Sequence, residues 1–286
     1  MALKRRSRGR YPAKVWNLAI WATGMAVTVL WLIPIIWLFS SSLKPEAQIL
    51  TLKPQLIPRT ITLEHYRSLF DYPILLWLRN SLVVSVATTV LTLATACPAG
   101  YAFARFSFKG HKALFMVVLA SLMVPFESGM VALYLLVVRM GIRSTLLGMI
   151  LPVVVSPVSV YVFRNFFFSL PKDLEDAAAI DGCGPWETFL RVALPLAKPA
   201  LVVLTIVNFV DVWNQFLWPL LVGTRETKTL AVGITILNPS RADTSAAFRF
   251  GPAMAAAGVL ALPTLIVYLL LQRHFVEGVS TTGLKG

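Results

Sequence analysis

The chain has little charge and few side chains that bind metals. Asp, Glu, Lys and Arg make up only 14% of its 286 residues, whereas hydrophobic residues make up 57%. A soluble domain has about 25% charged residues. Only two cysteines and three histidines are present, and their spacing fits neither a disulfide framework nor a zinc site. This composition excludes an ordinary soluble domain and indicates a membrane protein.

The sequence also lacks the phosphate-binding motif G-x-x-x-x-G-K-[ST], so any ATP hydrolysis would belong to another chain. It lacks a cluster of carboxylates and histidines at a membrane face, which a membrane-embedded transferase would need. No internal repeat relates the two halves, and this counts against an inverted-repeat secondary transporter driven by an ion gradient. We predict a chain without catalysis of its own that binds no metal or cofactor itself.

Long apolar runs predict an all-α fold with six membrane-spanning helices. Four of the runs contain no Asp, Glu, Lys or Arg, and each reaches the ~20 residues that a spanning helix needs. Two further segments are apolar but less uniform, and Pro125 should kink the first of them. The predicted spans are Trp16–Phe39, Ser81–Phe103, Ala113–Val138, Thr145–Phe163, Pro199–Val222 and Gly251–Leu271.

Basic residues crowd the segment before the first span. The net charge of +13 alone could indicate nucleic acid, but the placement of the charge is that of a topology signal that also contacts anionic lipid. Residues 1–14 are therefore predicted to be cytoplasmic, and six spans return the tail, 273–286, to the same side. The uncharged run that follows exceeds the about 7–15 residues of a secretory signal, so we expect it to be retained.

A polar segment, 165–199, separates the fourth and fifth predicted spans. Its first half places Leu174, Ala177 and Ala178 on one face of a short helix. Small side chains on that face would let another surface approach the backbone closely. Gly182 then breaks the helix, because glycine accepts the backbone angles of a tight turn.

The second half of this segment has a helical pattern of its own. Pro185 suits the first position of a helix, where its missing N–H costs nothing. An apolar stripe follows, and Pro195 ends it. The stripe consists of Trp186, Phe189, Leu190 and Ala193.

The polar segment could lie on the bilayer surface as an amphipathic loop, or it could bind a soluble protein. The stripe beginning at Trp186 suits the first alternative. Glu175, Asp176 and Asp181 suit the second, because anionic lipid repels carboxylates. We favour a docking surface.

This segment resembles the EAA loop of ABC-importer permeases, whose pattern is close to E-A-A-x-x-D-G followed by a helix and L-P. Asp176 stands where the family usually has Glu, so the carboxylate reaches one methylene less far, and Cys183 replaces a small residue. The matching positions are Asp176, Ala177, Ala178, Asp181, Gly182, Leu194 and Pro195. Four further phrases are similar to the carbohydrate-uptake branch, of the maltose-permease G-subunit type: 41–49, 101–110, 211–220 and 272–278.

The resemblance implies a type I ABC-importer permease fold, with residues 15–272 as the permease domain in a bacterial cytoplasmic membrane. It implies a heterodimer with a second permease subunit, two copies of an ATPase that binds ATP and magnesium, and an extracytoplasmic substrate-binding protein. The solute would be a sugar or, alternatively, another small polar molecule. The ATPase-coupling residues would be Glu175, Asp176, Ala177, Ala178, Asp181, Gly182, Trp186 and Phe189.

Asp211 interrupts the fifth predicted span. At ~1.5 Å per residue it would lie roughly 18 Å from Pro199, past the middle of the bilayer. Ionisable groups at that depth usually face a cavity or a partner. Helical spacing places Asn208, Asp211, Gln215 and Trp218 on one face, with Asn214 adjacent.

Such a polar stripe with an aromatic ring suits a sugar, which offers hydroxyls at its edges and C–H groups on its faces. The alternative is that the stripe only joins helices through hydrogen bonds, and both interpretations stay open. Glu127 is a second candidate for the translocation pathway. For Glu127 we favour a structural ion pair with an arginine near the outer surface.

Overall fold

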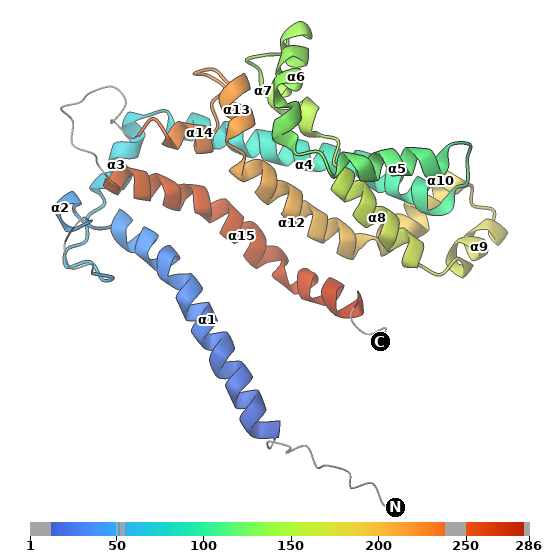
Figure 1. Cartoon of the computed structure of the whole chain (residues 1–286), viewed down its shortest axis with the longest axis horizontal. Coiled ribbons are helices and arrows are strands. Elements are labelled where there is room, and N and C mark those ends of the chain that lie inside the picture. The colour runs from blue at the N-terminus through green and yellow to red at the C-terminus, as the bar shows by residue number, and fades with distance from the viewer. Residues whose placement is uncertain (1–12, 50, 52–54, 238–249, 283–286) are drawn as a thin grey trace, which may run out of the picture.

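The computed structural model describes residues 13–49, 51, 55–237 and 250–282. Every regular element within these ranges is a helix. The long helices are α1 (Ala13–Ser42), α4 (Ile74–Arg105), α12 (Lys198–Asn214) and α15 (Phe250–Thr282), and Figure 1 shows how the shorter helices surround them. The all-α prediction is confirmed.

Six spans are present if each bent pair of helices is taken as one. Helices α1, α4 and α15 are each long and apolar enough to cross a membrane alone. The first two bent pairs join α5 (His111–Ser121) to α6 (Phe126–Arg139), and the short turn 146–153 to α8 (Pro157–Ser169). The third joins the helical turns of 185–196 to α12 at an angle of 73°.

Short elements connect the long helices. They are α2 (Glu46–Ile49), α3 (Glu64–Ser68), η1 (Leu69–Asp71), α7 (Leu146–Ile150), η2 (Leu151–Val153), α9 (Asp173–Ile180), α10 (Pro185–Thr188), η3 (Phe189–Ala193), α11 (Leu194–Leu196), α13 (Leu217–Val222) and α14 (Leu230–Ile234).

Helix α4 forms the centre of the molecule. It packs along α8 and α12, while α15 packs against α12 and α1 (Figure 1). A Cβ atom at Gly100 would lie only 2.5 Å from the Cβ atom of Phe163. The close approach of α4 and α8 therefore requires glycine at this position. By contrast, α1 diverges from the other helices, and its apolar stretch is not buried by the chain.

Several predicted spans differ in detail from the structure, and the fourth is bent by 45° between Val153 and Pro157. The expected kink at Pro125 is a full break, because α5 and α6 meet at 102° and the proline cannot continue a helix from the preceding turn. The predicted fifth span is also interrupted, since Gln215 has an extended ψ of 127° and α12 ends there. Helix α15 runs beyond the predicted end at Leu271. The basic N-terminus falls outside the described residues as far as residue 12.

Candidate functional site

The polar segment folds as α9 and a second helical stretch, 185–196, joined by a tight turn. Gly182 has a left-handed φ of +86°. Its N–H donates to the Ala179 carbonyl at 3.1 Å, and the Cys183 N–H donates to the Ala178 carbonyl at 2.9 Å. These two bonds form a Schellman motif, which closes the last carbonyls of α9 and needs a left-handed residue at the position of Gly182.

A buried ion pair fixes this segment to the end of α4. The Arg105 Nε donates to the Glu175 Oε1 at 2.6 Å, and the two side chains are only 5% and 19% exposed. The same guanidinium donates through Nη2 to the Leu170 carbonyl at 2.9 Å. Arg105 therefore holds both ends of the connection between α8 and α9. The sequence analysis missed this pairing, because the two residues lie 70 positions apart.

The predicted coupling residues divide into an exposed and a buried set. Ala178 and Phe189 are buried, at 7% and 4% exposure, and Glu175 is half-buried. The exposed set consists of Asp176, Ala177, Asp181, Gly182 and Trp186. Ile180 belongs to the same exposed ridge at 87% exposure, and the sequence analysis did not select it. Large apolar side chains left open beside a tight turn are typical of a surface that contacts another protein or the membrane.

The predicted apolar stripe in the second half is split. Phe189 and Ala193 are buried, whereas Trp186 and Leu190 are 63% and 43% exposed. Phe189, Leu190 and Ala193 lie in η3, a π-helix whose turn is wider than 3.6 residues, whereas Trp186 precedes it in α10.

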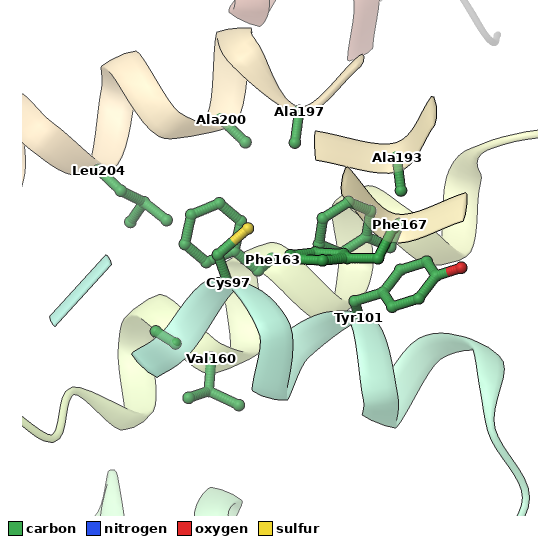
Figure 2. Packing of buried hydrophobic residues seen from close by; sticks show 11 residues of the cluster. Cys97, Tyr101, Val160, Phe163, Phe167, Ala193, Ala197, Ala200 and Leu204 are labelled. Atoms are coloured by element: carbon green, nitrogen blue, oxygen red, sulfur yellow. The ribbon is translucent and has the colours of Figure 1, made fainter. Parts of the chain in front are cut away.

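The buried half of this segment belongs to the packed core of the molecule. Figure 2 shows Ala193 and Ala197 beside Phe167, with Tyr101 of α4 close by. The Tyr101 ring lies 5.1 Å from the Phe189 ring and 5.3 Å from the Phe167 ring. The segment is thus seated on α4 and α8 and does not hang from them as a loose loop.

A cavity of about 700 Å³ lies between α4, α6, α8, α12 and α13. All of the predicted pathway residues line it: Glu127, Asn208, Asp211, Asn214, Gln215 and Trp218. Gln215 and Trp218 lie beyond the end of α12, so they do not continue its helical face as predicted. The break at Gln215 nevertheless turns them to the same cavity. Whether solute passes here stays a prediction.

The amides near this cavity support the helix-joining alternative for Asn208. Its Nδ2 donates to the Ser159 Oγ of α8 at 3.0 Å and to the Leu204 carbonyl at 2.7 Å. Asn214 donates to the Val210 carbonyl within its own helix at 2.8 Å. Both hydrogen bonds occupy the Asn208 amide, and the one to Ser159 joins α12 to α8. The Asn214 side chain is exposed.

The two carboxylates at the cavity differ from Asn208 in that no other described residue binds them. Asp211 and Glu127 are both exposed at its surface. Among the described residues, neither carboxylate forms a hydrogen bond or an ion pair. The arginine partner favoured for Glu127 is therefore not found in the described part of the chain.

Trp218 packs in the core and offers no stacking surface. Its side chain is fully buried, its Nε1 donates to the Met149 carbonyl at 3.3 Å, and its ring meets the Phe126 ring edge-on at 6.2 Å. The half-buried rings of Phe126 and Phe216 line the cavity instead. The sequence analysis missed them because they come from a different helix and from the break after α12.

Thr88 was also missed. It lies on α4, is 1% exposed and lines the cavity. Its hydroxyl has no hydrogen-bond partner in the described part of the chain, whereas that of Thr92, one turn on, donates to the Val154 carbonyl at 2.8 Å. A buried hydroxyl without a partner is costly, so its position beside a cavity is informative.

The model of one protein family matches residues 93–281, and its description is binding-protein-dependent transport system inner membrane component. The chain belongs to this family. Membership agrees with the predicted resemblance and with a multi-pass protein of the inner membrane.

Several curated proteins of this family resemble the whole chain. One is the arabinooligosaccharides transport system permease protein AraQ of Bacillus subtilis, which is 36% identical. The alignment covers 95% of this chain and 97% of AraQ. The trehalose transport system permease protein SugB of Mycobacterium tuberculosis is 34% identical, with 89% and 93% coverage. Both matches cover most of this chain and most of the relative.

A solved structure confirms the permease fold. It is a bacterial ABC transporter involved in the import of the acidic polysaccharide alginate, and one of its chains superposes with a TM-score of 0.81. The superposition covers 94% of this chain and 100% of the other at 20% sequence identity. A second structure of an alginate transporter contains a periplasmic protein with a bound alginate pentasaccharide and superposes with a TM-score of 0.63.

Proposed function

We propose that the chain is one permease subunit of an ATP-driven importer that moves a sugar or a sugar derivative into the cell. The observation that carries this proposal is the double role of α4. Its last residue, Arg105, holds the polar segment, and Thr88, which lies earlier in the same helix, lines the cavity. One rigid helix therefore connects a docking surface to a candidate solute path.

The remaining subunits are assigned by what this chain lacks and by what its relatives do. A second permease subunit would complete the path across the membrane. Two copies of an ATPase would bind ATP and magnesium and engage the ridge around Gly182. A binding protein would deliver the solute from outside, as the family description implies. Both termini of this chain would be cytoplasmic.

Sugar is the favoured solute because of the relatives and the cavity. The relatives are named for arabinooligosaccharides, diacetylchitobiose and trehalose. A volume of about 700 Å³ lies in the range of small-molecule sites, and amides, carboxylates and two half-buried rings line the cavity.

In this proposal, ATP-driven closure of the ATPase pair moves the docked segment. The movement reaches the cavity through two routes. One is the Arg105–Glu175 pair to α4, and the other is the buried Phe189 and Ala193 to α8. Packed elements of this kind shift as rigid bodies between discrete arrangements.

Uptake of a labelled sugar by the reconstituted complex tests the proposal. Vanadate should abolish uptake, and dissipating the ion gradient should leave it unchanged. Ile180→Cys should form a crosslink to the ATPase subunit. The control is exposed Leu56→Cys in the outer segment, which is the connection between α1 and α4 that a cytoplasmic N-terminus would place outside the cell. Vanadate-resistant uptake, or a crosslink from residue 180 only to lipid, would overturn the proposal.

A further inference from the structure

The cavity carries charge of one sign only. Among the described residues that line it, Glu127 and Asp211 are the only ionisable ones, and both are acidic. The chain as a whole carries a net charge of +13. The charge of the described cavity lining is therefore opposite in sign to the net charge of the chain.

Neither carboxylate is neutralised within the described structure. The two ion pairs found there, Arg105–Glu175 and Arg191–Glu187, belong to the polar segment and its surroundings. Two helices contribute the two acids, Glu127 from the first turn of α6 and Asp211 from the last turn of α12. A solute between them would therefore meet negative charge from two helices.

A second feature indicates that a polar ligand belongs in this cavity. Thr88 lines it, and the buried Thr88 hydroxyl has no hydrogen-bond partner among the described residues. Such a group is satisfied when a ligand supplies the missing hydrogen bond. A sugar hydroxyl can supply it, as can water.

We propose that the cavity admits neutral or cationic saccharides and rejects anionic ones through the field of Glu127 and Asp211. This inference rests on the proposed sugar import. A uronate or a phosphorylated sugar would bring a like charge into a partly water-excluded space, where charges interact more strongly than in bulk water. The hydroxyls of a neutral sugar instead donate hydrogen bonds to the carboxylates.

The proposal separates this chain from one of the proteins whose fold it shares. The solved transporter at a TM-score of 0.81 is described as an importer of an acidic polysaccharide. The two chains are only 20% identical, so a common fold is compatible with opposite preferences for solute charge.

The experiment measures the sign of the potential with two thiol reagents of similar size and opposite charge. These are the trimethylammonium and the sulfonate forms of methanethiosulfonate ethyl. Val155→Cys provides the target, because Val155 lines the cavity and is 75% exposed. Cys183→Ala removes the half-buried native thiol, and Cys97 is buried. Ile57→Cys, 82% exposed on the outer segment, is the control.

In the complete complex, the rate of labelling by the cationic reagent is divided by the rate for the anionic reagent at each position. This ratio should be at least about tenfold higher at position 155 than at position 57, because the carboxylates attract the cationic reagent and also repel the anionic one. Glu127→Gln with Asp211→Asn should bring the two ratios together, and each single variant should give an intermediate value. Equal ratios at positions 155 and 57 while Glu127 and Asp211 are both present would overturn the proposal. So would a ratio at position 155 that neutralisation leaves unchanged.

The labelling result is independent of which solute is carried. If the unmodified complex does not take up sugar when ATP is supplied, the proposed function is wrong, whatever the labelling ratios are. Sugar uptake with equal labelling ratios would overturn only the charge selection.

Discussion

Arg105 and Glu175 join the last residue of α4 to the first turn of α9 through a contact of 2.6 Å that is almost closed to solvent. A buried ion pair is weak evidence for stability, because desolvation offsets much of the attraction. It is strong evidence for a fixed position, because neither partner can move away without leaving the other unpaired.

We predict that Arg105→Gln or Glu175→Gln alone will lower stability by about 3 kcal/mol, since each leaves one buried group without its partner. Uptake should fall while ATP hydrolysis by the complex continues. Thermal unfolding of the purified complex and uptake in proteoliposomes measure the two effects. The double variant should recover part of the stability, as a double-mutant cycle shows. Strictly additive losses would mean that the pair does not act as a unit.

Gly182→Leu should uncouple ATP hydrolysis from uptake while the protein still inserts. The left-handed φ of +86° costs a residue with a Cβ atom roughly 1–2 kcal/mol, and the added bulk stands on the exposed ridge. Gly182→Ala carries the backbone cost without most of the bulk, so it separates the two effects. Gly184→Ala, at a φ of −71°, is the unstrained control. Wild-type uptake by the leucine variant would refute the docking role.

Asp211→Ala should lower solute uptake more than it lowers assembly, because the carboxylate has no partner among the described residues. Asn208→Ala should lower both together, because its amide joins α12 to Ser159 of α8. Uptake rate per purified complex, set against the yield of that complex, distinguishes the two roles. A loss of assembly with Asp211→Ala equal to its loss of uptake would make Asp211 a structural residue.

Thr88→Val should leave stability unchanged or raise it slightly, because it removes a buried hydroxyl that has no partner. It should lower uptake if that hydroxyl meets the solute. Thr92→Val is the matched comparison, because its lost bond to the Val154 carbonyl should cost about 1 kcal/mol. Uptake at several solute concentrations and thermal unfolding measure both variants. Wild-type uptake by Thr88→Val would remove Thr88 from the pathway.

Gly100→Ala should destabilise the complex by about 1–3 kcal/mol, since the new methyl group overlaps the Cβ of Phe163 and the nearby backbone. Gly129→Ala in α6 has open space around it and should be neutral or slightly stabilising. Thermal unfolding of both variants checks the contrast. Equal stability would mean that α4 and α8 can separate without cost.

The sequence predicted the features that depend on local pattern. Six apolar spans follow from length and hydropathy, and the turn at Gly182 follows from a glycine at the end of a short helix. The grouping of Asn208 and Asp211 followed from helical spacing, and both line the cavity. Each of these inferences needs only residues that lie close together in the chain.

The remaining features depend on contacts between distant segments. No periodicity pairs Arg105 with Glu175 or brings Thr88 and Phe126 to a cavity with Asp211. The π-helix at Phe189 was also out of reach, because it depends on how Phe189 and Ala193 seat between α4 and α8. The break after Asn214 has a partly local cause, because Pro219 in a continuous helix would clash with the Gln215 carbonyl.

The interruption at Gln215 and Phe216 has a consequence for the membrane as a barrier. It leaves backbone polar groups without helical partners partway across the span, and lipid cannot satisfy them. Such a stretch persists where water or protein groups reach it, and the adjoining cavity is a place where water can do so. A cell that stores energy as a proton gradient can keep a wet chamber in its membrane only behind a seal, which must hold on one side before it opens on the other.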